Sequence, residues 1–271
     1  MNSVSFVSSL PFENHIISAS GQTISINIIA DLVNDFSSTN FPLKSQIVCL
    51  CSIPKERFSI VGLTNCFYIF DPIKGSNSPA DYFELIETFE NEKIVYIDIS
   101  RYVDKINSNI YYIVVVTHIE NDVTKIRIYP FSITAFSSQF QLPIITTYNR
   151  YISTISSVVI NNNIHIIGSC KNNLLDFKLS NKMLGVVTQI NDVGIEIREI
   201  VYSGQIKNST YFFVGDKSRS VKLIELNNDL KQFNIISEEG FPRSITTLSS
   251  FQGSLIAGGD TLGDIFILKD D

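Results

Sequence analysis

The sequence carries the same short pattern twice near its C-terminal end, and this repeat limits the possible folds more than any other feature. In the first copy an apolar run ends in Gly215-Asp216, and a second apolar run begins at Val221. In the second copy the run ends in Gly259-Asp260 and the next begins at Ile265. Two short β-rich runs joined by Gly, Asp and Ser are typical of a β-hairpin. We interpret glycine as the supplier of the positive φ that such a turn needs, with aspartate bonding its own backbone.

The same marker, an apolar run that ends in glycine, recurs along the chain. It is found at Gly62, Gly168, Gly215 and Gly258. The later markers are spaced by roughly 40–50 residues, which is the period of β-propeller blades. The longer first interval contains a further pair of runs, Tyr112–Val116 and Lys125–Tyr129, and a weaker copy at 15–26 turns at Ser20-Gly21. The sequence therefore predicts an all-β, WD40-like β-propeller with five to six blades, forming a single domain over residues 1–271.

Composition agrees with a sheet protein. A chain of 271 residues fits one large all-β domain. Its 19 Phe and 11 Tyr, together with abundant Ile and Val, suit the pleated surface of a sheet. The chain has no Trp, so it lacks the usual Trp-Asp blade ending, and we expect a divergent propeller.

Net charge and the lack of targeting signals limit the partners and the cellular location that we expect. The formal net charge of −6 argues against direct binding to DNA or RNA, because affinity for nucleic acids comes from clustered Lys and Arg. The N-terminal residues lack the basic and apolar regions of a secretory signal, and no stretch reaches the 18 apolar residues of a membrane span. We expect a soluble, intracellular protein without a membrane partner.

Several local patterns lead to expectations for individual segments. Residues 1–29 are expected to form an edge pair of strands, and Asp31–Pro42 a polar loop. Residues 46–53 and 58–71 predict a three-strand meander that ends at Asp71-Pro72, because proline cannot donate to a ladder. Residues 74–81 are rich in turn formers and predict a surface loop, and Asn161–Asn163 predicts a hairpin turn.

No motif for catalysis, metal binding or cofactor binding is found. The four cysteines form no CxxC pair, and we interpret Cys49 and Cys51 as small buried hydrophobes. His165 stands between two isoleucines, far in sequence from His15 and His118, and we interpret it as structural. Phosphate-binding, dinucleotide-binding, nucleophile-elbow and zinc-protease motifs are absent from the sequence. We expect no enzyme activity, no cofactor and no small-molecule substrate.

Two charged patterns have a functional and a structural interpretation. One segment contains four glutamates, Glu84, Glu87, Glu90 and Glu92. Paired carboxylates can act as general acid and base in the hydrolysis of sugars. We favour the structural interpretation, in which these side chains lie on a solvated face. Lys125 and Arg127 alternate with apolar residues, and this pattern is a weak signal for nucleic-acid binding. An ordinary half-buried strand gives the same pattern, with both charged side chains pointing outward.

The C-terminal pattern resembles a known propeller superfamily. The superfamily contains the large subunits of splicing factor 3b, of cleavage and polyadenylation specificity factor (its A subunit), and of damage-specific DNA-binding protein. The residues that carry the resemblance are Gly215, Asp216, Ser220, Pro242, Arg243, Thr246, Gly258, Asp260 and Gly263. The runs Pro242–Thr246 and Asp260–Gly263 are most similar to the splicing factor 3b member. Ser244 and Asp264 stand where the family tends to carry Trp and Asn.

The resemblance implies a non-enzymatic scaffold of a nuclear RNA-processing complex, most similar to the splicing factor 3b complex of pre-mRNA splicing. Its partners would be other protein subunits, with nucleic acid contacted indirectly through the complex. Relative to the seven-bladed propeller of the family, the chain would be truncated at its C-terminal end and would leave open strand edges. Asp216 and Asp260 would either bond their own turns or contact a partner, and Arg243 would bridge blades by pairing with one of them.

Two alternatives stay open at this point. The same fold could act as an adaptor in a polyadenylation complex or in a ubiquitin ligase that responds to DNA damage. A propeller hydrolase is the third possibility, and it would need a metal or a carboxylate pair at the central channel.

Overall fold

The computed structural model describes residues 5–9, 15–29, 36–53, 56–72, 79–103, 109–120, 122–133, 138–251 and 255–269. Across these residues, every regular element except one 3-10 turn is a β-strand. None of their helices is long and apolar enough to cross a membrane. The chain divides into two compact units, Met1–Pro143 and Ile144–Asp271, which we call unit 1 and unit 2.

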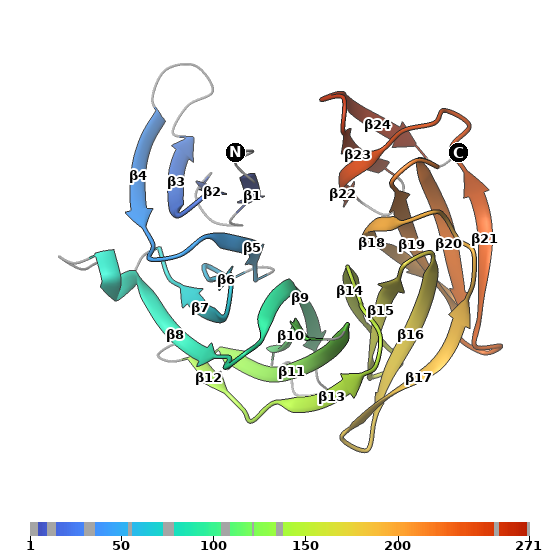
Figure 1. Ribbon diagram of the computed structural model, residues 1–271, viewed down its shortest axis with the longest axis horizontal. Helices are drawn as coiled ribbons and strands as arrows, with labels where there is room; N and C mark the ends of the chain where they lie inside the picture. Colours follow the sequence, from blue (N-terminus) through green and yellow to red (C-terminus); the bar gives the residue numbers. More distant parts are fainter. Residues whose placement is uncertain are drawn as a thin grey trace. The chain divides into compact units, whose positions relative to one another are not determined.

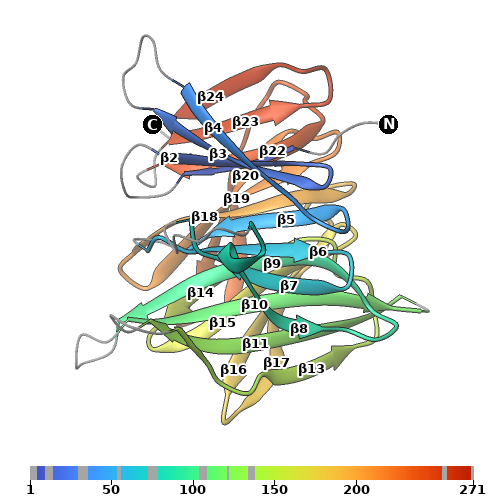
Figure 2. The ribbon, with the colours of Figure 1, turned by 90° about the vertical axis from the view of Figure 1, so that its left-hand side faces the viewer.

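The described part of unit 1 contributes four consecutive strands to each of three antiparallel sheets (Figures 1 and 2). Blade 1 consists of β1 (Ser5–Ser9), β2 (His15–Ser20), β3 (Thr23–Ile29) and β4 (Phe36–Pro42). Blade 2 consists of β5 (Ile47–Ser52), β6 (Ser59–Leu63), β7 (Cys66–Phe70) and β8 (Phe83–Thr88), with the 3-10 turn η1 (Pro79–Tyr82) before β8. Blade 3 consists of β9 (Lys93–Val103), β10 (Asn109–Ile119), β11 (Val123–Ile133) and β12 (Ser138–Phe140).

Unit 2 begins with β13 (Ile144–Tyr148) and its described part contains three further sheets (Figure 1). Blade 4 consists of β14 (Ile155–Ile160), β15 (Asn163–Cys170), β16 (Asn173–Ser180) and β17 (Met183–Ile190). Blade 5 consists of β18 (Ile197–Ile206), β19 (Ser209–Asp216), β20 (Val221–Asn227) and β21 (Gln232–Glu238). Blade 6 has three strands, β22 (Ile245–Phe251), β23 (Leu255–Asp260) and β24 (Ile265–Lys269).

These sheets confirm the predicted fold class, an all-β β-propeller, with six blades in the described residues. The positions of the marker glycines explain why their spacing predicted the blades. Gly62, Gly168, Gly215 and Gly258 each lie in the second strand of their blade, in β6, β15, β19 and β23. The fifth predicted pair, Tyr112–Val116 with Lys125–Tyr129, forms the β10–β11 ladder. The prediction of one domain over residues 1–271 stays a prediction.

The role that we assigned to the marker glycines was wrong. All four sit in extended strands rather than at the turn, where the positive φ belongs to Ser220 (62°) in one hairpin and Gly263 (90°) in the other. The markers are small because other side chains lie where their Cβ atoms would be: Cys49 and Ile97 at Gly62, Phe266 at Gly258, and residues of the next blade at Gly215. A Cβ on Gly215 would lie 2.6 Å from Ile245 Cγ2, in the first strand of blade 6. Close packing, and not turn geometry, therefore sets the repeat.

Apolar side chains fill the space between consecutive blades within each unit. In unit 1 one buried cluster joins blades 1 and 2, including Ile17 and Phe70, and another joins blades 2 and 3, including Phe67 and Tyr129. In unit 2 the corresponding clusters join blade 4 to blade 5 and blade 5 to blade 6. Because each blade face rests on its neighbour, a strand buried on both sides needs apolar residues on both faces.

The linkers between blades are held by backbone hydrogen bonds to the preceding hairpin turn. From blade 1 to blade 2, Leu43 and Ile47 donate to the carbonyls of Gln22 and Gly21, at 2.7 and 2.8 Å. The same pattern recurs at two later joins, where residues 89 and 94 donate to residues 65 and 64, and residues 193 and 197 donate to residues 172 and 171. The turn between the second and third strands therefore docks the linker to the next blade.

Three segment predictions need correction or qualification. Residues Phe36–Pro42, predicted as part of a polar loop, form β4, whose Phe41 is buried against Phe70 in a ring contact of 5.4 Å. The expected edge pair at 1–29 is three strands of a four-stranded blade. Most of the predicted loop at 74–81 lies outside the described residues. The meander at 46–71 and the turn at Asn161–Asn163 are confirmed.

Candidate functional site

Asp216, a predicted site residue, holds the join between blades 4 and 5. It ends β19 and only 2% of its surface is exposed. Its Oδ2 accepts the backbone N–H groups of Ile195 and Glu196, at 2.7 and 2.9 Å. Its Oδ1 accepts those of Ser218 and Arg219 in its own hairpin turn, at 2.9 and 2.8 Å. One carboxylate therefore ties the turn of blade 5 to the linker that enters the blade.

These donors keep Asp216 ionised. Burial of the carboxylate would raise its pKa, but the four backbone N–H groups favour the charged form more strongly, so the pKa of Asp216 lies below its ordinary value. The geometry is that of the turn-bonding interpretation, since the four backbone donors lie in the turn and in the linker.

Arg243 organises the next join, between blades 5 and 6. Its Nε donates to Glu239 Oε1 at 3.0 Å, and Glu239 Oε2 accepts a hydrogen bond from the Ser220 hydroxyl. The Ser220 N–H donates to the Arg243 carbonyl at 3.1 Å. Arg243 Nη1 also lies 4.0 Å from Asp260 Oδ2. We call Ser220, Glu239, Arg243 and Asp260 the linker network, and three of its four members were predicted site residues.

Two aromatic rings complete the surroundings of Arg243. Its guanidinium lies 4.7 Å from the ring centre of Phe241 and 4.6 Å from that of Phe266. Phe266 is buried, and it fits there because Gly258 on the paired strand has no Cβ, which would collide with the ring. Arginine over aromatic faces is stabilised by the ring quadrupole. The predicted bridging role of Arg243 thus has a geometric basis, with Glu239 as its nearest carboxylate.

The remaining predicted site residues surround the turn of blade 6. Asp260 Oδ1 accepts the N–H groups of Leu262 and Asp264 at 2.9 and 3.0 Å, and Gly263 provides the left-handed turn residue. The Thr246 hydroxyl donates to the Gly259 carbonyl at 2.9 Å. Pro242 is exposed on the linker. The structure therefore brings Ser220, Arg243 and Asp260 together, and it places Asp216 at the preceding join.

Sequence reasoning missed Glu239 and Gly194. Glu239 is four residues before Arg243, and this charge spacing in a short linker was a usable signal. Gly194 precedes the two residues whose N–H groups bind Asp216, and a side chain there would collide with the carboxylate. Nothing in the local sequence distinguishes Gly194 from an ordinary loop glycine.

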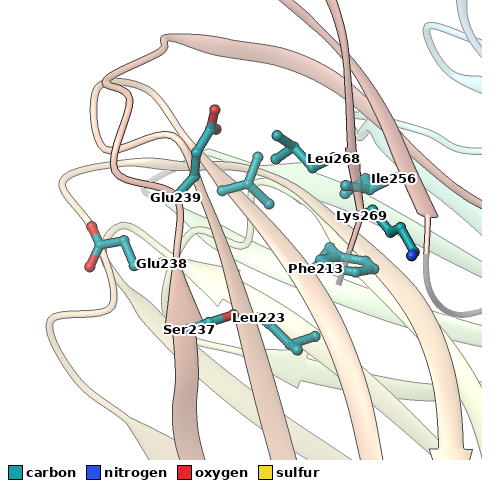
Figure 3. Close-up of a pocket in the computed structure, with 9 residues that line it drawn as sticks. Phe213, Leu223, Ser237, Glu238, Glu239, Ile256, Leu268 and Lys269 are labelled. Carbon is teal, nitrogen blue, oxygen red and sulfur yellow. The ribbon is translucent and has the colours of Figure 1, made fainter. Parts of the chain in front are cut away.

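A groove opens beside the linker network, between β21 and β24 (Figure 3). It has a volume of about 320 Å³, and we call it the β21–β24 groove. Its apolar lining includes Phe213, Leu223, Ile256 and Leu268, and its polar lining includes Glu238, Glu239 and Lys269. Figure 3 shows these side chains, with the Glu238 carboxylate pointing away from the apolar ones. The apolar floor and the few polar groups are typical of a binding surface.

The other face of β24 exposes large apolar side chains. Ile265 and Ile267 are 87% and 72% exposed, and Leu262 in the preceding turn is 85% exposed. The strand partners of Ile265 and Ile267 are Gly259 and Ala257, so no larger side chain of β23 lies directly across from these two isoleucines. This apolar surface and the groove lie on opposite faces of the same strand.

A second charged centre lies inside unit 1, and it corrects two predictions. Glu92 was expected on a solvated face and Arg127 was expected to point outward, yet both are buried. Glu92 accepts hydrogen bonds from Arg127 at 2.9 Å, from Lys125 at 2.7 Å and from Thr117 at 2.6 Å. Burial alone would raise the pKa of Glu92, but these three donors hold the pKa at about 2. Both faces of β11 are covered, so strand alternation alone misplaced Arg127.

Other chemically capable groups have structural partners. Glu92 lines a pocket of about 540 Å³ together with Asn65, Phe89 and His118. His165 Nδ1 lies 2.9 Å from Asp176 on the neighbouring strand, as a structural histidine would. Burial raises the pKa of the Cys49 thiol to about 12, which fits its interpretation as a small hydrophobe. In the part of the chain that the structure describes, no group of three or more His, Cys, Asp or Glu is arranged to hold a metal.

Comparisons with known proteins give no family for this chain. No protein-family model matches it, and no curated protein matches it either.

Proposed function

We propose that this protein is a non-enzymatic β-propeller scaffold that holds other protein subunits of a nuclear RNA-processing complex, with the splicing factor 3b complex as the first candidate. The observation that carries the proposal is the apolar surface of blade 6, where Leu262, Ile265 and Ile267 are exposed on one strand and its turn. Apolar side chains gathered on one exposed element favour a protein-binding surface.

The chemistry of the neighbouring polar residues supports a structural role for them. Asp216 binds four backbone N–H groups, and Arg243 binds Glu239 and two rings. A general acid or base must be able to reach a substrate proton. Residues that hold linkers in place make the blades rigid, which is what a scaffold requires.

The link to RNA processing rests on the resemblance of the C-terminal pattern. The net charge of −6 favours contact with nucleic acid through partner subunits rather than by this chain itself. A nuclear location is part of the same proposal.

Affinity purification from the cells of origin tests the proposal. The tagged full chain is isolated after nuclease treatment, and the bound proteins are quantified by mass spectrometry. We expect splicing subunits at near-equal amounts, and we expect their loss in the double variant Ile265→Ser, Ile267→Ser. The matched control is Val186→Ser with Val187→Ser, which changes two exposed apolar residues on β17.

Other results would point elsewhere. Polyadenylation subunits or ubiquitin-ligase subunits in place of splicing proteins would support the adaptor function instead. A chain that is recovered alone, with a correctly folded wild-type protein, would overturn the scaffold proposal.

A further inference from the structure

His165 has one ring nitrogen that the fold does not use. Only 8% of the residue is exposed. Its Nδ1 lies 2.9 and 3.0 Å from the two carboxylate oxygens of Asp176, on the neighbouring strand β16. A carboxylate can only accept hydrogen bonds, so Nδ1 carries the proton. Among the residues that the structure describes, none forms a hydrogen bond with the second nitrogen, Nε2, although polar groups of buried side chains usually have a partner.

The ring of His165 lines a small pocket between blades 4 and 5, which we call the His165 pocket. Its volume is about 50 Å³. A water molecule needs about 10–15 Å³ of such volume, and drug-sized ligands occupy about 300–1,000 Å³. The pocket therefore fits a small ion. Its polar lining is made of Asn161, His165, Asp176, Lys178, Asn228 and Lys231.

Two blades supply the charged and polar side chains of the pocket. His165 and Lys178 are direct partners in the β15–β16 ladder, and Asp176 is two residues before Lys178, so all three lie on one face of blade 4. Asn228 and Lys231 come from the hairpin turn between β20 and β21 of blade 5. The packing of blade 5 on blade 4 therefore brings the second lysine to the histidine.

The donors of the pocket have capacity for a ligand. In the described part of the chain, neither Lys178 nor Lys231 makes an ion pair. The amide nitrogen of Asn228 donates to the Thr210 hydroxyl at 3.2 Å, and it has a second N–H group. A protonated imidazole would cancel the charge of Asp176, and the two lysines would then leave two positive charges. A small anion with two negative charges and several acceptor oxygens matches this lining.

We propose that the His165 pocket binds a phosphate group as its dianion, either as free phosphate or on a phosphorylated side chain. The protonated Nε2 of His165 donates to one phosphate oxygen, and the ammonium groups of Lys178 and Lys231 pair with the others. A neutral ring takes the proton on Nε2 from the monoanionic form of the phosphate. Two ammonium groups would repel a metal ion. This inference goes beyond the proposed scaffold function and does not depend on it.

Nuclear magnetic resonance of the full chain tests the proposal. The sequence contains three histidines, so substitution of each can assign their ring signals. Sodium phosphate is titrated at fixed pH and constant ionic strength, with sodium chloride as the reference salt. We expect the ring signals of His165 to shift in a saturable manner, with a dissociation constant on the order of 1 mM or lower. Ring signals of His165 that do not respond to phosphate would overturn the inference.

Two double variants locate the binding. Lys178→Met with Lys231→Met should weaken phosphate binding by about tenfold or more, since it removes two charge-assisted hydrogen bonds. The matched control, Lys182→Met with Lys207→Met, removes the same charge from two exposed turn residues that do not line the pocket. Its affinity should change by less than about twofold, because salt screens charges outside the pocket. Circular dichroism and melting temperature confirm that both variants fold, and equal weakening in the two would contradict the site.

A pair of peptides separates the two sources of phosphate. The probes are a short fluorescent peptide with a central phosphoserine and the same peptide with serine. Tighter binding of the phosphopeptide than of inorganic phosphate would support the site and assign it to a phosphorylated side chain. Tighter binding of inorganic phosphate would support the site and assign it to the free anion. Phosphopeptide binding that is unaffected by Lys178→Met with Lys231→Met would place the peptide elsewhere and overturn the inference.

Discussion

Gly194 leaves the space that the Asp216 carboxylate occupies, because a Cβ on residue 194 would collide with Oδ2. The same oxygen accepts the N–H groups of the two residues that follow, at 2.7 and 2.9 Å. The linker therefore wraps closely around the acid. The join between blades 4 and 5 depends on one residue that has no side chain and on another that has a charged one.

Replacement of Gly194 by alanine should destabilise the protein. The new methyl group must push the Asp216 carboxylate or the linker aside, and we expect the free energy of unfolding to fall by about 1–3 kcal/mol. Urea denaturation measures the change. Gly185→Ala is the matched control, since a Cβ there meets nothing within 4 Å. Its effect should stay within about 0.5 kcal/mol. Equal losses in the two variants would contradict the role of Gly194.

The stabilising effect of Asp216 should depend on pH. Burial would raise its pKa, but the backbone donors hold it below the ordinary value of 3.8. The unfolded chain therefore takes up the proton at a higher pH than the folded chain. The stabilisation is fully present above about pH 4 and is lost as the pH falls through the folded pKa.

The variant Asp216→Asn isolates this effect. At about pH 7 its free energy of unfolding should be about 1–3 kcal/mol lower than that of the wild type, because an amide cannot accept hydrogen bonds from all four N–H groups. The difference should shrink as the pH falls well below 4. Denaturation curves at a series of pH values test this, and a difference that does not vary with pH would refute it.

The buried centre of unit 1 should behave as a coupled pair. Arg127→Met leaves the buried Glu92 with one cation fewer, and Glu92→Gln leaves Arg127 unpaired. Each single change should cost about 3–5 kcal/mol, whereas the double variant should recover a large part of that loss. Lys217→Met, at the exposed pair with Glu196, is the control and should cost about 1 kcal/mol or less. Strictly additive losses in the double variant would argue against coupling.

Arg243→Ala should lower the melting temperature more than Lys125→Ala does. Loss of Arg243 removes the cation beside Glu239 and the contacts with two rings. Loss of Lys125 leaves Glu92 with Arg127 and Thr117. Each kcal/mol of lost stability should appear as about 2–4 °C in a thermal scan. Arg243→Lys should fall between wild type and alanine, because it keeps the charge without the planar fork. Equal melting temperatures for the two alanine variants would contradict the stabilising role of Arg243.

The repeat was readable from sequence because it reflects a local requirement that recurs in each blade. Gly62, Gly168, Gly215 and Gly258 mark the second strand of four blades. The pattern was correct although its cause was misjudged, since close packing of neighbouring side chains, and not the turn, requires the small residue. The strand at Phe36–Pro42 was missed because its polar composition resembles a loop, and one buried ring, Phe41, holds it.

The site could be predicted only in part. The runs 215–220 and 242–246 were identified from their order, and the structure joins Ser220, Arg243 and Asp260 in one network. Glu239 was missed, although its carboxylate links the members. Arg127 was expected to face solvent, because alternation along a strand cannot show that both faces of β11 are covered.

The amino-acid sequence by itself determined the strand content, the blade period and the hairpin turns, because these depend on residues close together in the chain. Only the tertiary structure decided which charges are buried, which carboxylate meets which cation, and where a groove opens beside β24. Those features arise where separate blades pack against each other. Their free energy comes from burial and pairing between residues distant in sequence, which no local pattern records.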